Sequence, residues 1–137
     1  MFSLRRFTPQ LFLTFCLGCC SCGSLQHSIE CSFYYRQSSS ENKLEEVVLQ
    51  VSANETERAT LGHLRLDLRY SDDKFEGASA GVRVLAGDQQ IFGSLYQLAQ
   101  GKRPQNQFQG DHGFTGLIYL THPREGGDYQ LICKSVK

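Results

Sequence analysis

The sequence predicts a single antiparallel all-β domain, a β-sandwich or small β-barrel of about seven strands, that follows a cleaved N-terminal signal peptide. Three observations predict this class. The chain begins with a short basic segment and an apolar run. From Ser28 onward, apolar and polar residues alternate with the period of two that is typical of half-buried strands. Clusters rich in Gly, Asp, Asn and Ser separate these stretches, as turns do.

Residues 1–22 have the pattern of a signal peptide. Two arginines and no acidic residue precede the apolar run Leu11–Cys20, whose length falls within the roughly 7–15 residues of a signal-peptide core. A membrane-spanning helix needs about 20 apolar residues. We therefore expect cleavage between Gly18 and Ser24, no transmembrane segment, and a single mature domain over residues 23–137.

Four cysteines cluster in Phe15–Ser24, the segment FCLGCCSCGS. They lack a second pair of cysteines at the spacing of a zinc site. The segment instead resembles a bacterial lipobox, whose cysteine is lipidated after cleavage, with Cys19 or Cys20 as the candidate. Both cysteines depart from the lipobox pattern at one or more preceding positions. Lipidation and ordinary secretory cleavage therefore both stay open.

The charge balance argues against a nucleic-acid partner. Without the two arginines of the signal segment, 12 basic residues face 14 acidic ones. A nucleic-acid-binding domain typically carries a strong excess of clustered Lys and Arg. We expect no nucleic acid among the partners, and contact with a membrane only through a lipid anchor.

The clearest predicted strand is Leu61–Tyr70, in which Leu64, Leu66, Leu68 and Tyr70 share one face. His63, Arg65, Asp67 and Arg69 share the other, which is either a solvated face or, as a second interpretation, a binding strip. The other predicted strands are Ile29–Arg36, Leu44–Ala53, Ala78–Ala86, Gln90–Leu98, Phe114–Thr121 and Tyr129–Val136. Seven short strands with turn signals between them are typical of sandwiches and small barrels.

Cys31 and Cys133 lie in the first and last predicted strands. The alternation places Cys31 on the apolar face of its strand, with Ile29 and Phe33. It likewise places Cys133 on the face of Leu131. In an oxidising compartment, two inward-facing cysteines of an exported domain are expected to form a disulfide.

The long connection Gly101–Gly113 is the first candidate for a binding surface, because unpatterned loops of this length tend to be functional or loose. It combines amide side chains with one apolar anchor and one Asp–His pair. The candidate binding residues are Gln105, Asn106, Gln107, Phe108, Asp111 and His112.

The sequence contains no motif that identifies a catalytic centre, a metal site or a cofactor. Its serines and threonines lack the G-x-S-x-G pattern of a nucleophile elbow. His112 and His122 are ten residues apart and bracket a predicted strand, so they do not form a joint metal site. The remaining enzymatic alternative is an envelope enzyme or ligand carrier whose site is assembled around His63, Asp111 and His112.

These observations predict an exported, non-enzymatic binding or structural protein of the cell envelope, whose partner is a protein or another envelope component. The expected location is the bacterial periplasm or outer membrane, with a lipid anchor, or the secreted fraction. In outline the chain resembles the small periplasmic lysozyme inhibitors, which are also exported β-barrels with a disulfide near their ends. This resemblance is one of layout and implies, as a further alternative, an inhibitor of that kind.

Overall fold

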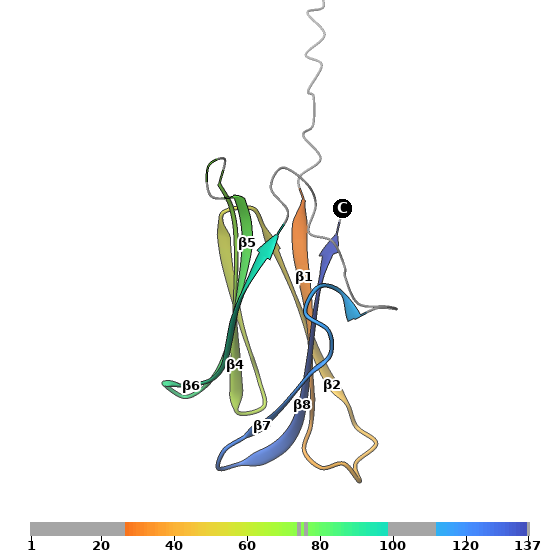
Figure 1. Ribbon diagram of the computed structural model, residues 1–137. Coiled ribbons are helices and arrows are strands. Elements are labelled where there is room, and N and C mark those ends of the chain that lie inside the picture. Colours follow the sequence, from red (N-terminus) through yellow and green to blue (C-terminus); the bar gives the residue numbers. More distant parts are fainter. Residues whose placement is uncertain (1–26, 74, 76, 99–111, 137) are drawn as a thin grey trace, which may run out of the picture.

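The computed structural model describes residues 27–73, 75, 77–98 and 112–136. They form eight strands and no helix longer than a single turn: β1 (Ser28–Arg36), β2 (Glu45–Ser52), β3 (Glu55–Leu61), β4 (Leu64–Asp73), β5 (Gly77–Ala86), β6 (Gln89–Leu98), β7 (Ile118–His122) and β8 (Gly126–Val136). The strands make two antiparallel sheets of four strands each, which pack face to face (Figure 1). The predicted all-β class is confirmed, and the architecture is a sandwich.

The strand order is β2-β1-β8-β7 in one sheet and β3-β4-β5-β6 in the other. The second sheet is a simple meander, in which each strand pairs with the next one along the chain. In the first sheet, the first and last strands of the domain lie side by side at the centre. The chain passes between the sheets from β2 to β3, and these two edge strands contact each other along one side of the sandwich.

The core lies between the inner faces of the two sheets. Leu64, Leu66, Leu68 and Tyr70 are buried, as the alternation in β4 predicted. From the opposite sheet, Phe33 and Tyr129 stack with ring centroids 5.7 Å apart. Apolar residues at every second position of both sheets therefore meet in one continuous core.

The predicted disulfide between Cys31 and Cys133 is present. The two residues are directly opposite each other in the β1–β8 pair, and both are completely buried. Disulfides of this kind are typical of proteins in oxidising compartments. Within the described residues, no helix has the length and apolar character needed to cross a membrane.

The strand that the sequence analysis missed is β3, so the sandwich has eight strands instead of seven. Its sequence, ETERATL, has only Ala59 and Leu61 as apolar residues facing inward. β3 is an edge strand, and its apolar alternation is too short to produce a period-two signal. A tight turn at Ala53–Asn54 joins it to β2, with Asn54 at a φ of 67°.

The strand expected at Phe114–Thr121 begins only at Ile118. Gly113 and Gly116, with φ of 61° and 71°, interrupt the extended backbone before it. The resulting turn lies against β8 and hydrogen-bonds to it: the Phe114 N–H donates to the Cys133 carbonyl at 2.9 Å. The Cys133 N–H in turn donates to the Thr115 hydroxyl at 2.8 Å. Both backbone groups of Cys133 therefore find partners in the turn that precedes β7.

Candidate functional site

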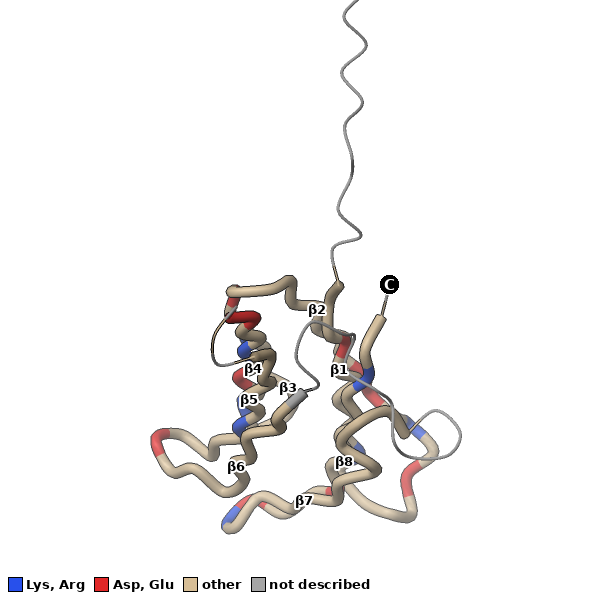
Figure 2. Tube along the Cα trace, turned by 45° about the horizontal axis from the view of Figure 1, so that its top comes forward, with Lys and Arg blue, Asp and Glu red and all other residues tan. Residues whose placement is uncertain are grey.

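The outer face of the β3-β4-β5-β6 sheet carries four arginines and two aspartates. One aspartate, Asp73, lies at the end of β4. The other five residues together we call the arginine face: Arg58, Arg65, Asp67, Arg69 and Arg83. Strand register explains the grouping. Arg58 on β3 and Arg83 on β5 are directly opposite Asp67 on β4. Figure 2 shows residues of both charge signs following one another along β4 and β5.

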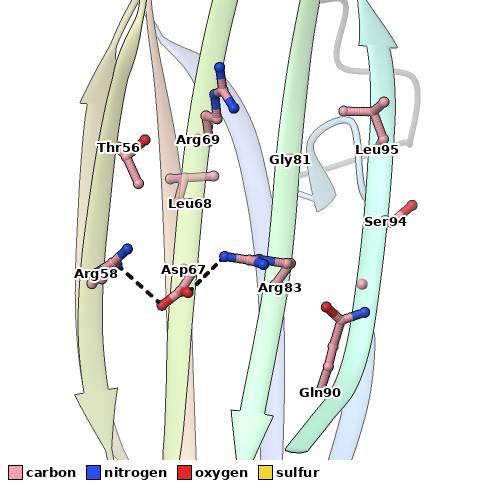
Figure 3. Close-up of a pocket in the computed structure, with 11 residues that line it drawn as sticks. Thr56, Arg58, Asp67, Leu68, Arg69, Gly81, Arg83, Gln90, Ser94 and Leu95 are labelled. Atoms are coloured by element: carbon pink, nitrogen blue, oxygen red, sulfur yellow. Dashed lines mark hydrogen bonds and ion pairs between the residues drawn. The ribbon is translucent and has the colours of Figure 1, made fainter. Parts of the chain in front are cut away.

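Asp67 is the centre of this arrangement. It accepts a hydrogen bond from Arg65 Nε at 3.0 Å and another from Arg83 Nη2 at 3.2 Å, and Arg58 Nε lies 3.8 Å away. In Figure 3, Arg58 and Arg83 point toward Asp67 from the strands on either side. The aspartate side chain is only 4% exposed, whereas the three arginines are 42–65% exposed. One buried carboxylate therefore orients three guanidinium groups that remain accessible to solvent.

Arg69 is the fourth cation and has a different environment. It is exposed and has no ion pair or hydrogen-bond partner among the residues that the structure describes. In Figure 3 its side chain points away from Asp67. With Asp73 counted, four arginines share this side of the sheet with two aspartates, so the excess is two positive charges. Guanidinium groups bind carboxylate and phosphate oxygens through paired N–H donors.

A groove of about 590 Å³ lies over this face, bordered by Arg69, Arg83, Gly81, Gln90 and Leu95. A second hollow of about 360 Å³ shares Arg69, Gly81 and Leu95 with it. This hollow continues along β5 past a small residue, Ser79, and Asp73 lines it at the end of β4. The two hollows form one concave surface whose long axis follows the strands.

Gly81 forms part of the floor of the groove, and packing does not require a glycine there. Its φ lies outside the left-handed region, and a Cβ at this position would meet only Arg69 Cβ, at 3.9 Å. Glycine inside a strand costs about 0.5–1 kcal/mol relative to alanine. Such a glycine often marks the close approach of a ligand or of another backbone. The missing side chain keeps the groove open between Arg69 and Leu95 (Figure 3).

Only part of this site could be predicted from the sequence, and the alternation in β4 was the source of that prediction. That alternation placed Arg65, Asp67 and Arg69 on one face of one strand, with a binding strip as the second interpretation. Arg58 and Arg83 were missed, because they join the site only through the register of β4 with its two neighbours. The usable signal was Gly81 and Gly93, two glycines in the interior of predicted strands.

The loop candidates are mostly outside the described residues. Gln105, Asn106, Gln107, Phe108 and Asp111 belong to residues 99–111, of which the structure describes nothing. His112 is described and is exposed, and its carbonyl accepts the Gly116 N–H at 3.0 Å. The binding role of this loop stays a prediction.

The histidines of the enzymatic alternative lie at different levels of the sandwich. The His63 N–H donates to the Tyr129 hydroxyl at 3.0 Å. The turn that follows His112 is instead bonded to Cys133, four residues further along β8. At about 3.3 Å per residue, that separation is about 13 Å. The described residues do not bring His63 and His112 together.

His63 instead lies beside His122, with the ring centroids 5.9 Å apart. The two rings border a hollow of about 440 Å³ that is also lined by Asp88, Arg124 and Glu125. His122 Nδ1 accepts the backbone N–H groups of Arg124 and Glu125, at 3.1 and 2.9 Å. In the neutral ring, Nε2 then carries the proton and is a donor, not a metal ligand. In the described part of the chain, no group of three or more His, Cys, Asp or Glu side chains is arranged to hold a metal ion.

Two buried tyrosines have shifted acidities. Burial raises the pKa of Tyr129, the neighbouring Tyr35 adds to this, and the hydrogen bond from His63 acts in the opposite direction. Burial also raises the pKa of Tyr70, with a smaller contribution from Asp72. Both hydroxyls therefore stay protonated near neutral pH, and that of Tyr129 accepts the His63 N–H.

In comparisons with known proteins, the chain matches no protein family, no curated protein and no solved structure.

Proposed function

We propose that the protein is an exported, non-enzymatic binding protein whose ligand-binding surface is the groove over the arginine face. The ligand carries anionic oxygens, either carboxylates or phosphates, and lies along the strands. The observation that carries this proposal is Gly81, a glycine that the fold itself does not need, at the floor of a groove beside a cation without a partner among the described residues.

The chemistry of the face supports the proposal. Arg58 and Arg83, which both line the groove, are oriented by the buried carboxylate of Asp67, so little side-chain entropy is lost when they bind a ligand. Thr56 and Gln90 add neutral hydrogen-bonding groups at the border, and the side chain of Leu95 is 74% exposed as an apolar contact. A few polar groups around a concave surface are typical of binding sites.

Variants of the groove test this function. Arg69→Gln removes a charge-assisted donor that contributes about 1.5–3 kcal/mol, which corresponds to about a ten-fold or larger loss of affinity. Gly81→Val fills the groove, and we expect it to abolish binding without lowering the melting temperature, because valine favours strands. The measurement is isothermal titration calorimetry with two probes, tetraglutamate and tripolyphosphate, at low salt.

The matched control is Arg124→Gln, which removes an exposed arginine outside the arginine face. It is expected to leave the affinity unchanged. The probe that binds the unmodified protein identifies the anionic group. The proposal fails if neither probe binds, or if Arg124→Gln weakens binding as much as Arg69→Gln.

Export places this binding protein in the bacterial cell envelope or the secreted fraction. The disulfide and the signal-like pattern of residues 1–22 support this location. We propose a lipid anchor on Cys19 or Cys20, on the basis of the lipobox-like segment.

The mass of the protein purified from its host tests the anchor. We expect a chain that begins at Cys19 or Cys20 and carries acyl groups. An unmodified chain that begins between Ser21 and Ser24 would instead identify a released protein. A chain that retains residue 1 would contradict export by this route.

A further inference from the structure

The edge strand β6 lacks the features by which proteins protect exposed strand edges. Among the described strands, β6 has a hydrogen-bonded neighbour, β5, on one side only. Its sequence, QQIFGSLYQL, contains no charged residue and no proline. The pairing of β6 with β5 shifts register at one end, near Gln90. From Phe92 to Leu98 the pairing is regular. Unprotected edges of this length are templates for an added strand.

The other three edge strands are protected. β2 and β3 carry charged residues and contact each other across the two sheets. β7 has only five residues, and Pro123 follows it. The contrast singles out β6 as the edge of the described domain that is suited to pairing with another chain.

The two faces of β6 determine which side chains an added strand would carry. On the inner face, Phe92 and Tyr96 are only partly buried and pack against the core. Apolar side chains of a neighbouring strand would extend this packing. On the outer face, Leu95 and Gly93 lie beside the groove, next to the excess of positive charge. Acidic side chains would be favoured there.

Charge argues against a second copy of this chain as the occupant. Two copies paired along β6 would place their arginine faces on one continuous surface. Each outer sheet face has an excess of two positive charges, with Asp67 and Asp73 against four arginines. Like charges brought together at an interface oppose association. An acidic strand has the complementary charge.

We propose that β6 binds, by strand addition, an extended segment of a partner protein in which apolar residues alternate with acidic ones. The apolar residues face the core beside Phe92 and Tyr96, and the acidic residues face the arginine groove. This inference rests on the proposed function for the charge of the ligand, and it names the ligand as a polypeptide. Backbone hydrogen bonds to β6 supply affinity, and the alternating side chains supply specificity.

The probe is the peptide acetyl-Thr-Val-Glu-Val-Glu-Val-Thr-amide, with a matched peptide in which lysine replaces glutamate. Hydrogen–deuterium exchange of the full chain is followed with each peptide. In the segment Phe92–Leu98, the backbone amides that point away from β5 are the ones an added strand would pair with. We expect the glutamate peptide to slow hydrogen exchange of these amides by about ten-fold or more. Exchange in β3 should not change. The lysine peptide should protect neither strand.

Substitutions at Leu95 test the charge without disturbing the core, because this side chain is 74% exposed. Leu95→Glu is expected to weaken binding of the glutamate peptide by about ten-fold relative to Leu95→Lys. Equal affinities of the two variants would overturn the acidic specificity. Equal protection of β6 by the two peptides would overturn it as well.

Three further outcomes would overturn strand addition itself. The first is slow exchange of all the Phe92–Leu98 amides in the free protein. The second is protection that rises with protein concentration alone, which would identify a second copy as the occupant. The third is binding of tetraglutamate in the groove while the alternating peptide leaves β6 unprotected. In that third case the proposed function of the arginine face stands and only the strand-addition inference fails.

Discussion

Removal of the Cys31–Cys133 disulfide will lower the free energy of unfolding by about 2–5 kcal/mol. The bond joins residues separated by 102 positions, and a closed loop of about 100 residues is worth about 4.7 kcal/mol in the chain-entropy model. The whole stability of a domain is about 5–15 kcal/mol. We therefore expect the double variant Cys31→Ala, Cys133→Ala to be partly unfolded at about 37 °C. Urea denaturation, followed by circular dichroism, measures the change.

Reduction of the unmodified protein provides the control, because it opens the bond without removing the sulfur atoms. Both sulfurs lie in the core, so the alanine variant should lose slightly more than the reduced protein, by the cavities that it leaves. A reduced protein with an unchanged urea midpoint would contradict the structural role of the bond.

Substitution of Gly113 by alanine will destabilise the domain by about 2–4 kcal/mol. Gly113 has a φ of 61°, and its added Cβ would overlap the carbonyl of Cys133, which cannot move without disturbing β8. The same turn supplies the two hydrogen bonds that satisfy the backbone of Cys133. A buried backbone group left without a partner costs about 1–3 kcal/mol. Thermal or urea unfolding measures the loss.

Gly87→Ala is the matched control for this substitution. Gly87 has a φ of 59°, close to that of Gly113, but a Cβ there would meet no atom within 4 Å. It isolates the backbone strain, which costs about 1–2 kcal/mol for a left-handed residue. If the two variants are equally stable, the contact between Gly113 and β8 does not contribute as described.

The core strands could be predicted because their alternation is strong and local. β4 is the clearest example: every second residue from Leu64 to Tyr70 is apolar, and all four are buried. The disulfide followed from the same pattern, since each cysteine is in phase with apolar neighbours. Residues 114–117 were wrongly included in a strand, because Gly113 and Gly116, both with positive φ, turn the chain there. A periodicity argument does not detect such a turn.

The candidate site was less predictable, because it is assembled across strands. Arg58, Asp67 and Arg83 are adjacent only because β3, β4 and β5 pair in one particular register. The burial of Asp67, on the face where solvent was expected, follows from the three arginines that cover it. In sequence, these residues are separated by up to a full strand and turn. The sequence therefore shows the charged residues, but their spacing does not show that they lie together in space.

The groove over the arginine face is expected to bind an anionic ligand. The most direct test is the amide NMR spectrum of isotope-labelled protein during titration with tetraglutamate. The amides of Gly81 and Gly93 and the side-chain N–H of Arg69 should shift together and saturate. The amides of Gly87 and Gly126, in turns outside the groove, should not shift. Shifts confined to the surroundings of His63 and His122, or no shifts at all, would contradict this expectation.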